Sequence, residues 1–241
     1  LQSGRKSLSI NSTDIETIFL KGVIHFEHKE SNRAINDFTR CLELRPDYGR
    51  ASFFRGMSYL QLGRIEDAIA SLREAISFGG DINAPYMLGY CYIATGDFAR
   101  ARQVLDEACK RTEICFIAEF YLGLVDYLQD NHAEAVKHFS AAVATCRGLL
   151  VTEPEFTVAR VIMAKALSFL GEEQECRKLL AMLEPEIHND GSVAMDIARA
   201  YAVLGDVDKA RVLLKAALET PQGPTQREID IDPIIGKTLA P

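Results

Sequence analysis

Small and apolar residues recur along the chain with a period close to 34 residues. In each period a Gly or Ala is followed by an Ala or Cys twelve positions later, a Phe or Leu sixteen positions later, and an Ala, Cys or Leu nineteen positions later. The apolar residues between these points follow the 3.6-residue spacing of amphipathic helices, in two segments per period. The pattern therefore predicts six helical hairpins, whose leading small residues are Gly22, Gly56, Gly89, Gly123, Ala164 and Ala198.

A short polar or glycine-containing breaker divides the two helical segments of most periods, as in LGRI, TGDF, QDNH, LGEE and LGDV. Glycine takes the left-handed conformation that ends many helices, which predicts turns at Gly63, Gly96, Gly171 and Gly205. The leading small residue would let the paired helices approach closely, and the Phe or Leu sixteen positions later would fill the gap beside it. One hairpin cannot bury such an apolar face alone, so the hairpins are expected to stack.

The spacing resembles that of the tetratricopeptide repeat, in which Gly, Tyr, Ala, Phe, Ala and Pro positions recur over 34 residues. Two segments carry the resemblance best: LKGVIHF…SNRAINDFTRCLELRPD at 20–47 and FRGMSYLQLGRIEDAIASLREAI at 54–76. The resemblance extends over about residues 15–220 and implies an all-α fold, a right-handed solenoid of stacked antiparallel helix pairs. The chain departs from the family pattern in having no Trp, and in placing Lys21 and Arg55 where Leu is usual.

The fifth repeat follows an interval of 41 residues rather than 34, which predicts an insertion near Pro154. Two extra helical turns before this proline would accommodate it, and the solenoid would divide there into four repeats and two. Residue Leu1 is not an initiator Met, so we expect a fragment or a processed product and leave residues 1–9 out of the fold argument. The expected organisation is an extension at 1–14, repeats one to four at 15–149, an insertion and turn at 150–156, repeats five and six at 157–220, and a C-terminal tail at 221–241.

The C-terminal tail, residues 221–241, is more apolar than a free tail would be. Its segment IDIDPII carries four isoleucines without a helical pattern. We therefore expect the tail to cap the last helix pair or to fill a groove, either its own or that of a second copy.

The composition of the chain narrows the classes of partner that it could bind and the compartment in which it is expected. The chain carries a net charge of −7 and has no run of basic residues, which disfavours nucleic acid. No apolar run approaches the roughly 18 residues that a membrane span needs. The six cysteines form no CxxC pair and are widely scattered, which favours free buried thiols in a reducing compartment. We expect a cytoplasmic protein in preference to a secreted or periplasmic one, with a signal peptide removed before Leu1 as the open alternative.

The sequence contains no phosphate-cradling glycine loop, no GxSxG and no HExxH motif. His25 and His28 offer two ligands, too few for a zinc site. Cys109 and Cys115 flank a turn between repeats, with no base placed beside either thiol. We therefore predict a non-enzymatic protein with no catalytic residue, no cofactor and no metal site.

By the resemblance, the first helix of each repeat lines a concave surface at its second, fifth, ninth, twelfth and thirteenth positions. Counted in this chain, those positions form a surface rich in aromatic residues and Met, which are favoured anchors at interfaces. The alternative is that adjacent helices pack these side chains away. The predicted peptide-binding groove comprises Phe19, Phe26, Phe53, Met57, Tyr86, Tyr90, Phe120 and Tyr127, with Arg50 and Lys165 among them.

Two binding modes known in the family are missing from their matching positions. The carboxylate clamp of Lys, Asn and Arg is absent, and the Asn ladder at the sixth position of each repeat is replaced by Leu20, Phe54, Met87, Tyr121, Ile162 and Asp196. We therefore predict an interaction scaffold that binds an apolar peptide or helical segment of a partner protein. The alternatives are a chaperone or assembly factor that shields an apolar client segment, a regulatory sensor module of a larger signalling protein, and self-association through the tail.

Overall fold

A computed structural model describes residues 14–112, 114–187, 190–220 and 223–238. The N-terminal extension, with the Asn-Ser-Thr sequence at 11–13, lies outside the described residues apart from Asp14. The described chain is helical and contains no strand. Its helices are α1 (Ile15–Glu27), α2 (Ser31–Leu44), α3 (Gly49–Gln61), α4 (Ile65–Ser77), α5 (Ala84–Ala94), α6 (Phe98–Lys110), α7 (Phe116–Leu128), α8 (His132–Thr152), α9 (Thr157–Leu170), α10 (Glu173–Leu183), the 3₁₀ turn η1 (Glu184–Glu186), α11 (Gly191–Val203), α12 (Val207–Glu219), α13 (Gln226–Asp230) and α14 (Ile235–Thr238).

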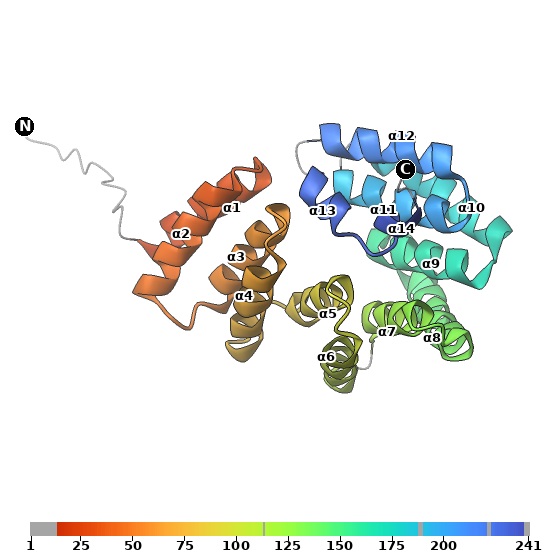
Figure 1. The fold of residues 1–241 in the computed structure, drawn as a ribbon, viewed down its shortest axis with the longest axis horizontal. Coiled ribbons are helices and arrows are strands. Elements are labelled where there is room, and N and C mark those ends of the chain that lie inside the picture. Colours follow the sequence, from red (N-terminus) through yellow and green to blue (C-terminus); the bar gives the residue numbers. More distant parts are fainter. Residues whose placement is uncertain (1–13, 113, 188–189, 221–222, 239–241) are drawn as a thin grey trace, which may run out of the picture.

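Each odd-numbered helix up to α11 packs against the even-numbered helix that follows it, and successive hairpins stack side by side. The ribbon follows an arc, with α1 and α2 at one end and α9 to α12 at the other (Figure 1). The solenoid of stacked helix pairs that the periodicity predicts is confirmed. Helices α13 and α14 lie on the inner side of this arc, where α14 contacts α11 and α13 contacts α3.

The leading glycines are required by close helix packing. A Cβ atom placed on Gly123 would lie 2.7 Å from the ring of Phe139, which is nearer than real Cβ contacts come. The same relation holds for Gly22 with Phe38 at 2.7 Å. In both hairpins the aromatic residue lies sixteen positions after the glycine, as the repeat predicts, and its side chain is fully buried. The spacing therefore encodes a close approach between paired helices, closed by one large side chain.

The predicted turns also form. Gly63, Gly96, Gly171 and Gly205 have φ between 71° and 80°. In the QDNH turn of the fourth repeat, Asp130 takes the same left-handed conformation with φ of 61°. A short polar side chain is one of the few that tolerates this region.

The insertion in front of the fifth repeat lengthens a helix. Helix α8 continues for 21 residues to Thr152, whereas its counterpart α6 has 13. The predicted extra turns before Pro154 are thus present. Residues 150–152 of the expected insertion segment 150–156 belong to this helix, where Leu149 and Leu150 still pack against the core.

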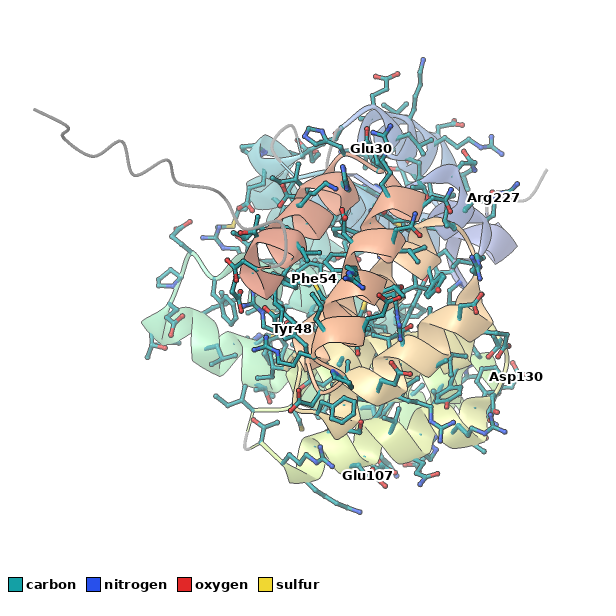
Figure 2. The ribbon with its side chains drawn as sticks, turned by 90° about the vertical axis from the view of Figure 1, so that its left-hand side faces the viewer. Glu30, Tyr48, Phe54, Glu107, Asp130 and Arg227 are labelled. Atoms are coloured by element: carbon teal, nitrogen blue, oxygen red, sulfur yellow. The ribbon has the colours of Figure 1, made fainter. Side chains whose placement is uncertain are left out.

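An aromatic cluster joins the first two hairpins. The ring of Phe54 contacts those of Phe19, Phe26, Phe38 and Phe53, with centroids 5.5–5.7 Å apart. In Figure 2, Phe54 lies among the helices of these hairpins, while Glu107 and Asp130 lie at the outer margin. Aromatic pairs at such distances add about 0.5–1.5 kcal/mol each beyond the area they bury.

Arg55, which replaces the usual Leu, binds across its own hairpin. Its guanidinium donates from Nε to the Ser71 hydroxyl at 3.1 Å and from a terminal nitrogen to the Glu74 carboxylate at 2.5 Å. Lys21, at the same position of the first repeat, pairs with Asp37 at 3.3 Å. A polar link between paired helices therefore takes the place of an apolar contact at this position.

Among the described residues, no helix combines the length and the apolar composition that crossing a bilayer would require.

Candidate functional site

A cavity of about 600 Å³ lies on the inner side of the arc, between the first helices of the repeats and the tail. Its wall is largely apolar and aromatic, with a few charged groups, which is the usual character of a ligand site in this size range. Helices α1, α3, α5, α7, α9 and α11 all contribute side chains, and so does the tail. We call it the concave cavity, and the side chains that give it its character are Phe26, Phe53, Met57, Leu60, Tyr86, Met87, Tyr90, Ile117, Tyr121, Ile162, Lys165, Met195, Asp196, Arg199 and Ile231.

Three charged residues that border the cavity lie together, of which Lys165 is buried and Asp196 and Arg199 are half-buried. Lys165 Nζ donates to the Asp196 carboxylate at 2.9 Å, and Arg199 donates to the same oxygen at 2.5 Å. Burial lowers the pKa of Lys165 from its usual value. Burial would raise the pKa of Asp196, but the two cations outweigh it and lower that pKa. Two cations face one anion in this Lys165–Asp196–Arg199 cluster, so the cluster alone carries an excess positive charge.

The tail supplies the missing negative charge. Asp232 is completely buried, and its Oδ2 accepts hydrogen bonds from Arg199 Nε at 2.7 Å and from the Tyr90 hydroxyl at 3.2 Å. Its Oδ1 accepts the backbone N–H groups of Ile234 at 3.0 Å and Ile235 at 2.8 Å. Burial, and then the Asp232 charge, raise the pKa of Tyr90 well above its usual value, so the phenol stays a donor. Asp232 thus neutralises the cluster and begins α14 at the same time.

The tail also reaches the opposite end of the arc. The Thr225 hydroxyl donates to the backbone carbonyl of Gln61 at the end of α3, at 2.8 Å. Lys29, in the turn after α1, donates its ammonium to the backbone carbonyls of Thr220 at 3.0 Å and Pro224 at 3.2 Å. Thr225 and Glu228 form a capping box that starts α13. The tail therefore connects the first two hairpins to the last one.

The isoleucines of the tail are divided between two parts of the core. Ile229 and Ile235 pack with the C-terminal hairpins. Ile234 and Ile231 pack with side chains of the second and third hairpins. Ile229, Ile234 and Ile235 are buried, whereas Ile231 is half-buried and borders the cavity. The tail is thus placed against the groove of its own chain.

Six of the ten residues predicted for the groove do lie around the cavity, namely Phe26, Phe53, Met57, Tyr86, Tyr90 and Lys165.

Phe19 and Phe120 do not line the cavity, and this is a correction. Phe19 is only 2% exposed, because Phe38, Tyr48 and Phe54 surround it and the Arg50 guanidinium covers its ring at 4.7 Å. Phe120 is 1% exposed and lies beneath the Lys165 ammonium, which is 4.7 Å from its ring centroid. Both rings are therefore core residues covered by a cation.

Tyr127 and Arg50 also lie outside the cavity. Tyr127 is at the end of α7 and packs its ring on Phe169, with centroids 4.9 Å apart. Arg50 is exposed at the start of α3, above Phe19. The prediction used the same helix positions in all six repeats, and this placed both residues in the groove. It was wrong for them because the part of the first helix that faces the cavity changes from repeat to repeat.

The lining positions drift along the solenoid. The first repeat contributes the end of its first helix, with Phe26 and Glu27, and the second contributes the middle and the end of its own, from Phe53 to Gln61. Later repeats contribute residues from the start to the middle of theirs, as Ile117 and Tyr121 do in α7. Each hairpin is rotated relative to the one before it, so a different part of each first helix faces the same cavity.

This drift explains which residues the sequence analysis missed. Met87, Tyr121, Ile162 and Asp196 line the cavity from the sixth position of repeats three to six. In this chain that position carries no Asn ladder, and the predicted groove did not include it. A signal was present: apolar or charged residues replace the ladder at all of these positions.

The histidines and paired cysteines form contacts elsewhere. His25 hydrogen-bonds Asp37 at 2.7 Å on the outside of the first hairpin. Ligand atoms of Cys109, Cys115 and Glu119 come within 4.8 Å of one another at the turn between the third and fourth repeats. Three such atoms are one fewer than a structural zinc site uses. Neither group borders the concave cavity.

Comparison with known proteins places these observations in a family. A tetratricopeptide repeat model matches residues 19–85 and 86–148, together more than half of the chain, and a second matches residues 194–216. None of the curated proteins compared with the sequence matches it.

Solved structures share the fold at low sequence identity. MamA from Desulfovibrio magneticus RS-1 is 22% identical, covers 57% of this chain and 78% of its own, and superposes with a TM-score of 0.52. YrrB, described as a TPR protein with an unusual peptide-binding site, is 18% identical over 87% of this chain and 96% of its own, with a TM-score of 0.51. A tetratricopeptide repeat protein from Parabacteroides merdae is 16% identical over 95% of this chain and 86% of its own, with a TM-score of 0.60.

Proposed function

Because the chain belongs to the tetratricopeptide repeat family, whose fold serves protein–protein interaction, we propose that it holds a segment of a partner protein in the concave cavity. The observation that carries the proposal is the cavity itself, an apolar and aromatic wall around the Lys165–Asp196–Arg199 cluster. The apolar and aromatic wall anchors the side chains of the bound segment, and the charged cluster fixes the orientation of that segment. The similarity to YrrB, a protein with a peptide-binding site, agrees with this assignment.

The size of the cavity favours a short segment. About 600 Å³ accommodates a few side chains and is too small for a folded client. This argues for recognition of a defined segment over general shielding by a chaperone. A small molecule is the competing occupant, since the volume is also typical of small-ligand sites.

Photo-crosslinking from inside the cavity tests the proposal. A photoreactive residue at Met87 should crosslink a discrete segment of a partner, which mass spectrometry of the crosslinked peptide identifies. The matched control is the same residue at Val212, which is 69% exposed on α12 and does not border the cavity. A synthetic copy of the identified segment should bind the purified chain, and Met87→Glu should weaken that binding while Val212→Glu leaves it unchanged.

Crosslinks that arise equally from both positions would contradict the proposal, as would a segment whose binding ignores Met87→Glu. A cavity that takes up a small molecule and yields no protein crosslink would favour the sensor alternative.

A further inference from the structure

The tail occupies the groove in the way that a bound segment would. Asp232 delivers a carboxylate to Arg199 and Tyr90, and isoleucines on either side of it pack against the surrounding hairpins. Ile231 borders the concave cavity together with Gly223, Pro224 and Glu228. The tail thus shows which chemistry the groove accepts.

We propose, building on the function proposed above, that the tail is an internal ligand and that the partner segment displaces it. The partner segment carries a carboxylate flanked by branched aliphatic residues, and its carboxylate replaces that of Asp232 on Arg199.

Charge supports this choice of ligand. When the tail leaves, Lys165 and the half-buried Arg199 share the carboxylate of Asp196, and a partner that covers both cations without bringing a second anion pays the cost of burying an unpaired charge. The replacement must therefore bring an anion to Arg199. The carboxylates of Glu27, Asp190 and Glu228 also border the cavity and would repel an anion near them. The anion of the partner is therefore required only at the end of the cavity where Arg199 lies. Glu228 is already engaged by the Thr225 backbone N–H at 2.8 Å.

Geometry supports displacement over simultaneous binding. The cavity lies beside the tail and stays open when the tail is docked, so a partner can bind the aromatic wall first. Its carboxylate reaches Arg199 only after Asp232 has left, since Asp232 takes up both the Nε and a terminal nitrogen of that guanidinium. The tail and the partner therefore compete for one cation.

The same chemistry could come from a second copy of this chain, whose tail has the identical sequence. We commit to a different protein as the source, because the tail already binds the groove of its own chain, with the capping box and the hydrogen bonds of Lys29 formed. Exchange between copies is an outcome that the experiment below detects.

A reversible lock on the tail tests the proposal in the full-length chain. A Cβ atom on Gly63 would lie 3.4 Å from Cβ of Arg227, close to the roughly 3.8 Å found in disulfides. We combine Gly63→Cys and Arg227→Cys with Asp232→Asn. The disulfide between the two cysteines holds the tail in the oxidised protein, and Asp232→Asn loosens the tail once the disulfide is reduced. The probe is a labelled synthetic peptide with the sequence of residues 223–238.

The reduced protein should bind the peptide and the oxidised protein should not. A peptide with Asn in place of Asp232 should bind about thirty-fold more weakly or worse, as expected for loss of one partner of a buried charge pair. The partner segment identified by crosslinking should show the same dependence on the lock. Because Gly63 has a positive φ, the reduced form of the same variant is the control for folding, and Asp232→Asn alone is a second one.

Equal binding to the oxidised and reduced forms would overturn displacement. Equal binding of the Asp and Asn peptides would overturn the carboxylate requirement. A dimer of the wild-type chain that dissociates on addition of the peptide would overturn the choice of a different protein as the source. A partner segment that crosslinks from Met87 and binds the locked and unlocked forms with equal affinity would leave the proposed function standing and remove only the present inference.

Discussion

Neutralising Asp232 is the sharpest single perturbation of this structure. The Asp232→Asn change removes the negative charge that faces Arg199 and Tyr90. It keeps one carbonyl oxygen, which still accepts the backbone N–H groups of Ile234 and Ile235 at the start of α14. The substitution therefore tests the charge with little effect on the helix cap.

The expected loss follows from the contacts of Arg199. Breaking a buried ion pair by removing one partner costs about 3–5 kcal/mol. Arg199 keeps its pair with Asp196, so we expect the lower limit, about 3 kcal/mol. For a chain of this size, that corresponds to a fall in melting temperature of about 6–12 °C. The loss cannot exceed the free energy with which the tail docks, because beyond it the tail simply leaves the groove.

Two measurements distinguish a loss of global stability from release of the tail. Thermal or urea unfolding gives the loss of global stability, and hydrogen exchange of the Ile234 and Ile235 amides reports on docking of the tail. The control is Asp106→Asn on the exposed face of α6, which should stay within about 0.5 kcal/mol of the wild type. If Asp232→Asn leaves both the melting temperature and the amide protection unchanged, the ion pair does not hold the tail and our reading of the groove is wrong.

Two further predictions concern the scaffold. Gly123→Ala should destabilise the chain by about 1–3 kcal/mol, because the new methyl group meets the Phe139 ring. Gly148→Ala has nothing within 4 Å of the new methyl group and should raise stability by about 0.5–1 kcal/mol. Urea unfolding of the two variants measures both changes, and changes of the same sign would refute the packing argument. His138 has a raised pKa because it hydrogen-bonds Glu119, an effect that burial partly opposes, so its stabilisation is complete below about pH 6.5 and is lost as the pH rises through the higher folded-state pKa. The His138→Gln variant should therefore lose more stability at acidic than at alkaline pH, and an equal loss at both would show that the charge is irrelevant.

Most of the scaffold could be predicted from the sequence, because helix pairing depends on local spacing. The first helices begin at Ile15, Gly49, Phe116, Thr157 and Gly191, each seven residues before the leading small residue of its repeat. The third departs by two residues, since its first helix starts at Ala84 and carries a proline in its first turn. A repeat of this kind encodes each hairpin and its neighbour, and little beyond them.

The site was less predictable, because it depends on contacts between distant repeats. The isoleucines showed that the tail is apolar, but nothing in the segment IDIDPII showed that Asp232 meets Tyr90, 142 positions away in the sequence. The rotation between hairpins is likewise a property of the whole stack. It moved Tyr127 and Arg50 out of the cavity and brought Tyr121 into it.

The tail changes how the solenoid should respond to a ligand. In repeat arrays each unit contacts only its neighbours, so stability is transmitted from one repeat to the next. Here Lys29 and Gln61 of the first two hairpins bind the tail that follows the last one, which ties the two ends of the arc together. A segment that displaced the tail would break these ties as it took over Arg199. Partner binding and opening of the arc would then be linked, and by thermodynamic reciprocity a change that weakens the ties at Lys29 would strengthen partner binding at Arg199, on the far side of the cavity.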